Sequence, residues 1–227
     1  MLDRPLLAKR YIFFDMDGTL VDSQFAILDS LRLAMKENGV REPDCLSMDL
    51  IGPPIAEIVR KIDPEVSEDA LNGVVASFRR LYDSAPERGL VPYDGIPDLL
   101  LSLKNQGFNL YVVTNKPIKP TRKILDHLGW DMFARVVTPD SGPDPAVKRN
   151  KAESIQSLIA EEGLNPADVF MVGDTFGDVR AAHKAGVAAA AVLWGYEKDK
   201  QGLTGEAEFF VSEPMGLITF LTTPDQR

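Results

Sequence analysis

The chain has 227 residues, of which 44% are hydrophobic and 26% are charged, a composition typical of a folded globular protein with one large domain or a domain plus an insert. The formal net charge is −9 and no long basic run occurs, which argues against nucleic acid as a partner. A small phosphorylated metabolite stays compatible with this charge, because a few cations can reverse the field inside one cleft.

Segments that direct a chain to a membrane or to secretion are not expected here. No apolar run approaches the roughly 18 residues that span a bilayer, so we expect no membrane partner. The first residues form no apolar stretch long enough for a secretory signal. The single cysteine, Cys45, excludes an intrachain disulfide, and we therefore expect a cytoplasmic protein.

Short apolar runs predict buried β-strands, with helical patterns between them. The predicted strands are residues 11–14, 110–114, 135–138, 169–173, 188–193 and, more weakly, 208–211. The predicted helices are residues 96–106, 118–128, 151–162 and 176–185, with a capping box at Asn150 and Glu153 and stop signals at Gly163 and Gly186. Because strands and helices alternate, we predict the α/β class, with a Rossmann-like parallel sheet covered by helices on both faces.

The stretch after the first strand does not follow this alternation. Apolar residues recur there at helical spacing, and Gly39, Gly52-Pro53-Pro54 and Asp63-Pro64 interrupt the pattern. We therefore predict an all-helical insert at residues 22–89, and an α/β core made of residues 1–21 and 90–227.

The sequence FFDMDGTLVD places two carboxylates, Asp15 and Asp17, where the first strand should end. Ligands of open parallel sheets bind at the carboxyl ends of the strands. Two crowded carboxylates are reasonable if a divalent cation such as Mg²⁺ neutralises them, or if one acts as nucleophile and the other as general acid and base. Taken alone, an Asp-x-Asp pair such as this one could equally be a polar turn that ends the strand.

Polar residues also follow two later strands and open one later helix. Thr114 and Asn115 follow one predicted strand and have groups that bind phosphate oxygens. Asp174 follows another, with Asp178 four residues on, and Lys151 opens the helix before that strand. Each has an ordinary reading as a turn, a helix cap or a surface lysine. Their joint occurrence at strand ends favours a phosphate and metal site.

These motifs resemble the haloacid dehalogenase superfamily of phosphohydrolases. The resemblance rests on Asp15-Met16-Asp17-Gly18-Thr19, on VVTN with Thr114, on a lysine and on VGDTFGD, in that order over nearly the whole chain. The helical insert is similar to the cap typical of the phosphoglycolate phosphatase-like branch, and the segments TNKP and VPYDGIPDLLLSLKNQG also resemble that branch.

The resemblance implies a Mg²⁺-dependent phosphatase that works through an aspartyl phosphate. Asp15 would attack phosphorus, and Asp17 would protonate the leaving oxygen and then activate water. Asp15, the backbone carbonyl of Asp17 and Asp174 would hold Mg²⁺, with Asp178 in support. Thr114, Asn115 and Lys151 would hold the phosphoryl oxygens.

One motif departs from the family pattern, which often carries its lysine in a Lys-Pro-x-Pro run. Here the region reads GPDPAVKRNKAESI, so Lys148 and Lys151 compete for this role. We prefer Lys151 because it opens a helix and because one helix and one strand separate it from Asp174.

Alternative activities stay open at this point. A sugar phosphomutase would use the same acids to pass phosphate between two hydroxyls. An aspartyl-phosphate signalling receiver also combines acids, a threonine and a lysine, but it is about half this length and lacks a helical insert.

Substrate choice is expected to lie with the insert. The turn Ile51-Gly52-Pro53-Pro54 resembles a substrate-contacting loop, so we expect Gly52 and Pro53 to contact substrate. Four cations could meet a substrate carboxylate, namely Arg60, Lys61, Arg79 and Arg80. The phosphoester remains open among phosphoglycolate, nucleotides and sugar phosphates, and the protein could be a monomer or a homodimer.

Overall fold

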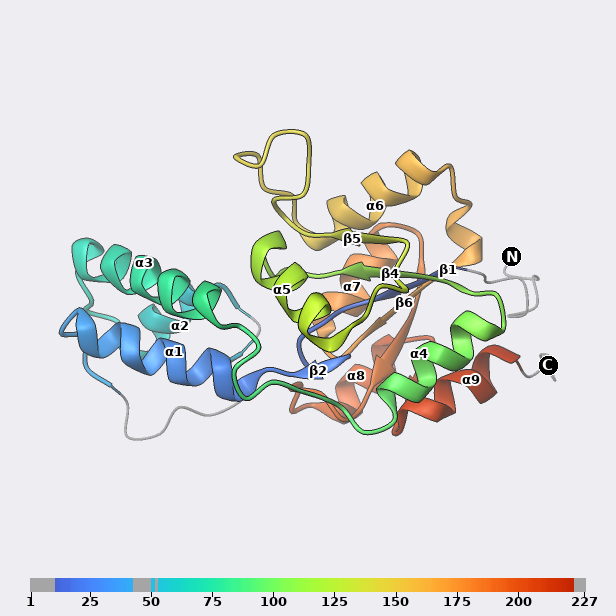
Figure 1. Cartoon of the computed structure of the whole chain (residues 1–227), viewed down its shortest axis with the longest axis horizontal. Helices are drawn as coiled ribbons and strands as arrows, with labels where there is room; N and C mark the ends of the chain where they lie inside the picture. The colour runs from blue at the N-terminus through green and yellow to red at the C-terminus, as the bar shows by residue number, and fades with distance from the viewer. Residues whose placement is uncertain (1–10, 43–49, 52, 223–227) are drawn as a thin grey trace.

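Six parallel strands form the central sheet, in the order β5-β4-β1-β6-β7-β8 (Figure 1). They are β1 (Tyr11–Phe14), β4 (Asn109–Val113), β5 (Arg135–Val137), β6 (Val169–Gly173), β7 (Ala188–Val192) and β8 (Phe209–Val211). The structure is a computed structural model that describes residues 11–42, 50–51 and 53–222, so that Cys45 and Gly52 lie outside the described residues. Within the described part, no helix combines the length and the apolar character that crossing a bilayer requires.

Helices cover both faces of the sheet. One face packs against α4 (Ile96–Asn105), α5 (Ile118–Leu128) and α9 (Pro214–Thr222), and the other against α6 (Lys151–Glu162), α7 (Phe176–Lys184) and α8 (Lys200–Glu206). Side chains of β1 alternate between these layers, since Ile12 and Phe14 join one apolar cluster and Phe13 joins the other. This double burial explains why the strands are apolar throughout.

The predicted α/β class is confirmed. Strands β1 and β6 and helices α5 and α6 have the predicted bounds, and the other predicted elements differ by one residue at one or both ends. Helices α8 and α9 and the 3₁₀ turn Pro166–Asp168 were not predicted. A two-stranded antiparallel ribbon of β2 (Val21–Asp22) and β3 (Val91–Pro92) was also missed, because two residues are too few to show a period.

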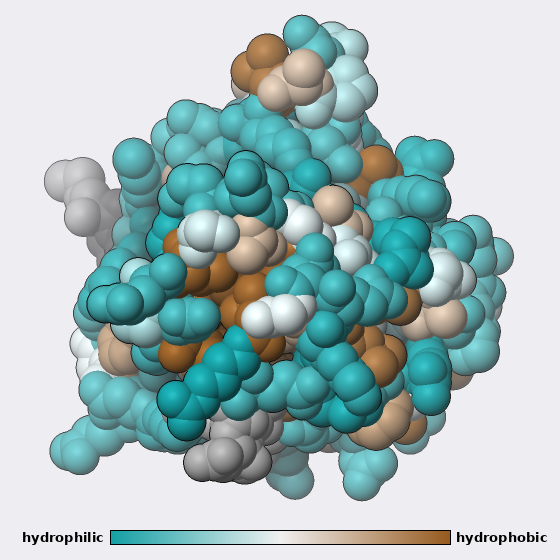
Figure 2. Space-filling view, turned by 90° about the vertical axis from the view of Figure 1, so that its left-hand side faces the viewer, coloured by the Kyte–Doolittle hydropathy of each residue, from teal (hydrophilic) through white to brown (hydrophobic). Residues whose placement is uncertain are grey.

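The helical insert consists of α1 (Gln24–Glu37), α2 (Ile55–Ile62) and α3 (Glu68–Ser84), and it forms a lobe beside the sheet (Figure 1). It has an apolar core of its own, in which Leu31, Val59 and Val74 are completely buried. The β2–β3 ribbon joins the lobe to the core, and there we place the proposed boundaries of the insert, residues 22–89. Seen from the insert, the surface is largely hydrophilic, with a group of apolar residues near the middle of the view and smaller ones elsewhere (Figure 2).

The register of the sheet brings the ends of three strands together. Phe14 at the end of β1 pairs with Val112 of β4 on one side and with Val172 of β6 on the other. The ladder extends one residue further, because the Asp15 amide donates to the Val172 carbonyl at 2.9 Å. The residues that follow β1, β4 and β6 therefore share one edge of the sheet.

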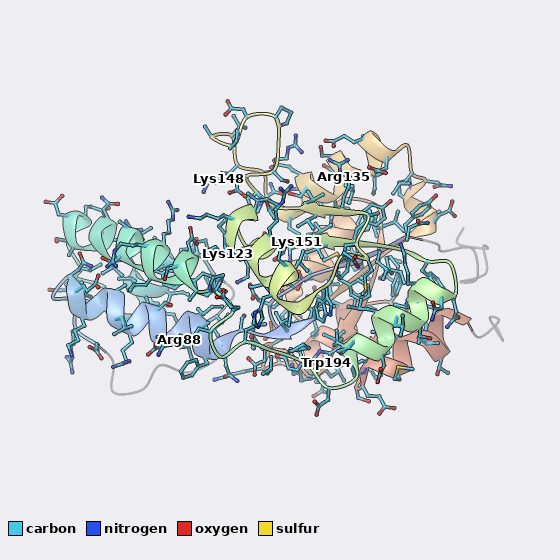
Figure 3. All side chains as sticks on the ribbon, in the orientation of Figure 1. Arg88, Lys123, Arg135, Lys148, Lys151 and Trp194 are labelled. Carbon is cyan, nitrogen blue, oxygen red and sulfur yellow. The ribbon has the colours of Figure 1, made fainter. Side chains whose placement is uncertain are left out.

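Loops after β1 and β7 approach each other very closely at this edge. The Trp194 indole donates to the Thr19 carbonyl at 3.0 Å, and Trp194 lies below the sheet in Figure 3. A Cβ atom on Gly195 would lie 2.2 Å from the Asp174 Cβ and 2.4 Å from the Gly18 carbonyl oxygen. Only glycine fits at position 195, because a side chain there would push these loops apart.

We predict that Gly195→Ala lowers the free energy of unfolding by about 1–3 kcal/mol, the usual cost of forcing an extra carbon into a packed site. Gly205→Ala is the matched control, because a Cβ there meets nothing within 4 Å and lies in α8. It should be neutral or stabilising by up to about 1 kcal/mol. Urea unfolding measures both, and a Gly195→Ala protein as stable as wild type would contradict the close approach.

Candidate active site

Three carboxylates meet at the shared edge of the sheet. Asp15 follows β1, Asp174 follows β6, and Asp178 lies in the first turn of α7. All three are buried, and one carboxylate oxygen from each lies within 4.8 Å of the others. Like charges this close and this dry repel each other strongly, so the site needs positive charge to hold its shape.

One lysine supplies part of that charge. The Lys151 ammonium lies 2.9 Å from Asp15 Oδ1 and hydrogen bonds to Asp178 Oδ1. Lys151 is the first residue of α6, and the predicted capping box of Asn150 and Glu153 is present there, which fixes the start of the helix. The structure thus brings Lys151 to the acids.

Lys148 lies on the exposed loop before α6, where it lines the cavity beside the site without contacting the clustered acids. In Figure 3 it is above α5, whereas Lys151 points into the centre of the core. The preference for Lys151 as the phosphate-binding lysine remains a prediction, but Lys151 alone of the two contacts the clustered acids.

Burial changes the proton affinity of the clustered acids. Loss of hydration raises the pKa of Asp15 to about 6, although Lys151 opposes this rise. Burial, assisted by the charges of Asp178 and Asp15, also holds the pKa of Asp174 well above its usual range. Burial alone would lower the pKa of Lys151, but the carboxylates beside it raise the value overall.

The cluster fits a divalent cation such as Mg²⁺. Three carboxylates against one ammonium leave an excess of negative charge, and carboxylate oxygens are the ligands that Mg²⁺ prefers. Asp15 Oδ1 is buried, and the Lys151 ammonium lies 2.9 Å from it. A divalent cation would compensate the negative charge that this single ammonium leaves on the three carboxylates.

Neighbouring groups fix the orientation of the other two acids. The Tyr196 amide donates to Asp174 Oδ2 at 2.7 Å, and the Thr19 hydroxyl donates to Asp174 Oδ1 at 3.2 Å. Thr175, rather than Asp174, caps α7, and its amide and hydroxyl donate to Asp178 Oδ2 at 3.0 and 2.6 Å. These bonds hold the carboxylates in place although they repel each other.

Asp17 lies apart from the cluster and faces the insert. Its Oδ1 accepts a hydrogen bond from the Ser23 hydroxyl at 2.5 Å, and its Oδ2 lies 3.0 Å from the Lys116 ammonium. The Asp17 side chain is not one of the clustered carboxylates. Asp17 is therefore predicted to bind the metal ion through its backbone carbonyl. Gly18, with φ of 81°, lets the chain turn sharply after it.

Lys116 and Tyr82 were not predicted as site residues. The buried Lys116 ammonium hydrogen bonds to the Tyr82 hydroxyl of α3 and lies 4.4 Å from the centre of its ring. Burial favours the neutral amine of Lys116, but Asp17 and Tyr82 together raise its pKa. The sequence TNKP placed Lys116 at this edge, whereas no local pattern pointed to Tyr82 in the insert.

A cavity of about 530 Å³ opens above these groups, between the core and the insert. Thr114, Asn115 and Pro53 line it, as do Asp15 and Lys151. Among the cations expected to meet a substrate, Arg79 lines the cavity, while Arg60 pairs with Glu68 and Arg80 pairs with Glu37 at the surface.

Comparison with known proteins agrees with this geometry. The family described as haloacid dehalogenase-like hydrolase matches residues 12–192. The chain is 31% identical to a phosphoglycolate phosphatase of Aquifex aeolicus (93% of this chain, 96% of the relative) and 32% identical to a 5'-nucleotidase of Pseudomonas aeruginosa (86% and 88%). It is also 30% identical to the tyrosine-protein kinase PtkA of Mycobacterium tuberculosis (98% and 72%).

A solved structure shares the fold. A haloacid dehalogenase-like hydrolase from Streptococcus pneumoniae superposes with a TM-score of 0.82 at 25% identity, over 95% of this chain and 99% of the other. Its similarity therefore extends over both the sheet and the helical insert.

We predict that chelation of divalent cations destabilises the protein more at about pH 7.5 than at about pH 5.5. Because the pKa of Asp15 rises from 3.8 to about 6 on folding, its proton stabilises the folded state fully below pH 3.8. This stabilisation by the Asp15 proton is lost as the pH rises through about 6. Above that pH the ionised carboxylate needs a bound cation to offset its charge.

Melting temperatures with MgCl₂ and with EDTA at the two pH values measure this effect. Asp126→Asn, which changes an exposed acid of α5, should keep the full difference, and Asp15→Asn should reduce it. An equal effect of EDTA at both pH values would contradict the assignment.

We predict that Lys116→Met lowers the free energy of unfolding by about 2 kcal/mol, because it leaves Asp17 and Tyr82 without their shared partner. Lys123→Met is the matched control, since Lys123 is exposed and donates to the backbone carbonyls of Asp83 and Ser84 at the end of α3 rather than to a buried charge. It should cost less than about 1 kcal/mol. Urea unfolding compares them, and equal costs would contradict the special role of Lys116.

Proposed function

Because the chain belongs to the haloacid dehalogenase-like hydrolases and is a phosphoric monoester hydrolase of that family, we propose that it is a Mg²⁺-dependent phosphatase that uses an aspartyl-phosphate intermediate. Its substrate is a small phosphorylated metabolite. One observation carries the proposal: Asp15 directly follows the central strand β1, lies in a buried cluster of acids beside a lysine, and lines a cavity between the core and the insert.

Asp15 is the nucleophile of the proposed reaction. Its carboxylate oxygen attacks phosphorus, the bond from phosphorus to the leaving oxygen breaks, and an acyl phosphate forms. Lys151, 2.9 Å away, favours the ionised carboxylate that this attack requires. Water then attacks the phosphorus of the intermediate, which releases phosphate and restores Asp15.

Asp17 is the general acid and base. It is one residue removed from Asp15 and lines the same cavity, so it can reach the leaving oxygen without contacting phosphorus. It gives a proton to that oxygen in the first step and takes one from the attacking water in the second. Ser23 and Lys116 hold its two oxygens and so restrict its direction.

The remaining groups bind and orient the phosphoryl group. Thr114, Asn115 and Lys151 hold its oxygens, and Pro53 contacts the rest of the substrate from the insert. Asp15, the backbone carbonyl of Asp17, Asp174 and Asp178 would hold Mg²⁺. When bound, the ion would neutralise charge on the phosphoryl oxygens, as phosphoryl transfer requires.

A sugar phosphomutase is the second candidate, because the same acids can pass the phosphoryl group to a second hydroxyl. The difference lies in whether water or a bound hydroxyl reaches the intermediate beneath the insert. A signalling receiver is disfavoured by the match to a hydrolase family over residues 12–192. We place the protein in the cytoplasm, on the basis of its single cysteine.

We predict that Asp15→Asn lowers Mg²⁺-dependent phosphate release by at least about 10³-fold, because an amide cannot form the acyl phosphate. Phosphate release from a panel of phosphomonoesters measures this loss. Asp126→Asn, far from the cluster on α5, should keep wild-type rates. Normal turnover by the Asp15→Asn protein would refute the mechanism, and transfer to a second hydroxyl without release of phosphate would favour the mutase.

A further inference from the structure

The two walls of the cavity differ in chemistry. The core contributes a floor rich in carboxylates and lysines, whereas the insert contributes a roof of mostly apolar side chains, with Arg79, Tyr82 and Asp83 at its polar positions. Ile55 and Ile58 of α2 and Val75 and Phe78 of α3 form this roof, with Ile51 before them. A leaving group that points away from the phosphate site must therefore contact hydrocarbon.

The cations of the floor are already engaged by the protein. Lys151 contacts Asp15 and Asp178, and Lys116 contacts Asp17 and Tyr82. A second anionic group on the substrate would have to compete with these buried carboxylates. The floor can thus bind one phosphoryl group, but among its described residues it has no buried, unpaired cation for a second anionic group on the same substrate.

The roof offers little to a second acid either. Among the described residues that line the cavity, the other cations are Arg79 and Lys148, and both are exposed to solvent. Pairs formed by exposed cations are weakened by hydration and salt. Residues 43–49 and 52 contain no lysine or arginine that could add to them.

The size of the cavity favours a larger leaving group. Its volume of about 530 Å³ falls in the range of sites that enclose drug-sized ligands, roughly 300–1,000 Å³. A phosphoryl group with a two-carbon acid would leave much of the roof without contact. A ring would remove the roof from water and gain dispersion contacts with it.

We propose that the insert selects phosphomonoesters whose leaving group carries a ring with an apolar face, an aryl or nucleoside group, over short carboxylated alcohols such as glycolate. This inference rests on the proposed function and narrows its substrate class. Binding energy from the ring also holds the insert closed over the phosphoryl group, which keeps bulk water out of the site.

Steady-state kinetics on wild-type protein with MgCl₂ compares p-nitrophenyl phosphate, adenosine 5'-monophosphate and phosphoglycolate. We expect kcat/KM for at least one ring ester to exceed that for phosphoglycolate by about 10-fold or more, the discrimination that a few apolar carbons provide. A preference for phosphoglycolate that Arg79→Gln abolishes would overturn the inference.

Roof variants locate the selectivity. Ile55→Asn and Val75→Asn, which place an amide on half-buried roof positions, should lower kcat/KM for the preferred ring ester by about 10-fold and change that for phosphoglycolate less. Leu81→Asn is the matched control on α3, because Leu81 is also half-buried against the insert core but does not line the cavity. Equal losses for both esters in the roof variants would count against selection by the roof.

Asp15→Asn separates the two proposals. Hydrolysis that survives in this variant would refute the proposed function, whereas Asp15-dependent hydrolysis that prefers phosphoglycolate would refute only the inference about the roof. Calorimetric binding of the same esters to Asp15→Asn protein tests the preference without turnover. Tighter binding of phosphoglycolate than of both ring esters would overturn it.

Discussion

The mutual repulsion of three buried carboxylates is the constraint on which the rest of the structure depends. Asp15, Asp174 and Asp178 are each brought to one edge by a different segment, and Lys151 neutralises only part of their charge. The surrounding fold holds them against this repulsion. The parallel register sets the ends of β1 and β6 side by side, and capping boxes fix the first turns of α6 and α7. A site arranged in this way is poised for a cation, because the protein has already paid the cost of burying its ligands.

The two carboxylates of the first motif, Asp15 and Asp17, lie in different surroundings. Asp15 faces inward to the cluster, and Asp17 faces outward to the insert, where Lys116 connects it to Tyr82 of α3. The same helix end is held to the core by Lys123, which donates to the carbonyls of its last residues. In Figure 3, Lys123 lies between α5 and the insert. The insert is thereby linked through the buried Lys116 to Asp17, the group proposed as acid and base.

Local patterns were sufficient to predict the α/β core. Strands such as β1 and β6 are apolar on both faces, and α6 carries its capping box in four consecutive residues, so their bounds follow from short-range chemistry. The Asp15–Lys151 and Lys116–Tyr82 contacts differ in this respect. The first could be expected once the strand order was assumed, because both residues flank the same edge. The second joins residues 34 apart through the packing of the insert, and a tyrosine at helical spacing is indistinguishable from a core residue until α3 is placed.

The core and the insert thus contribute different kinds of free energy to substrate binding. In the core, the lysines that would recognise a phosphoryl group already pair with buried carboxylates. Binding of the phosphoryl group would therefore exchange one set of buried ion pairs for another, and the net gain in binding free energy would be small. The insert presents hydrocarbon, whose contribution grows with the apolar area that a ligand covers and does not depend on its charge. Under the proposed function, the core would recognise the phosphoryl group, and the alcohol would be distinguished by side chains of the insert that have no part in the chemistry. Since the roof belongs to α2 and α3, substitutions there can change the leaving group without disturbing the carboxylate cluster on which the reaction depends.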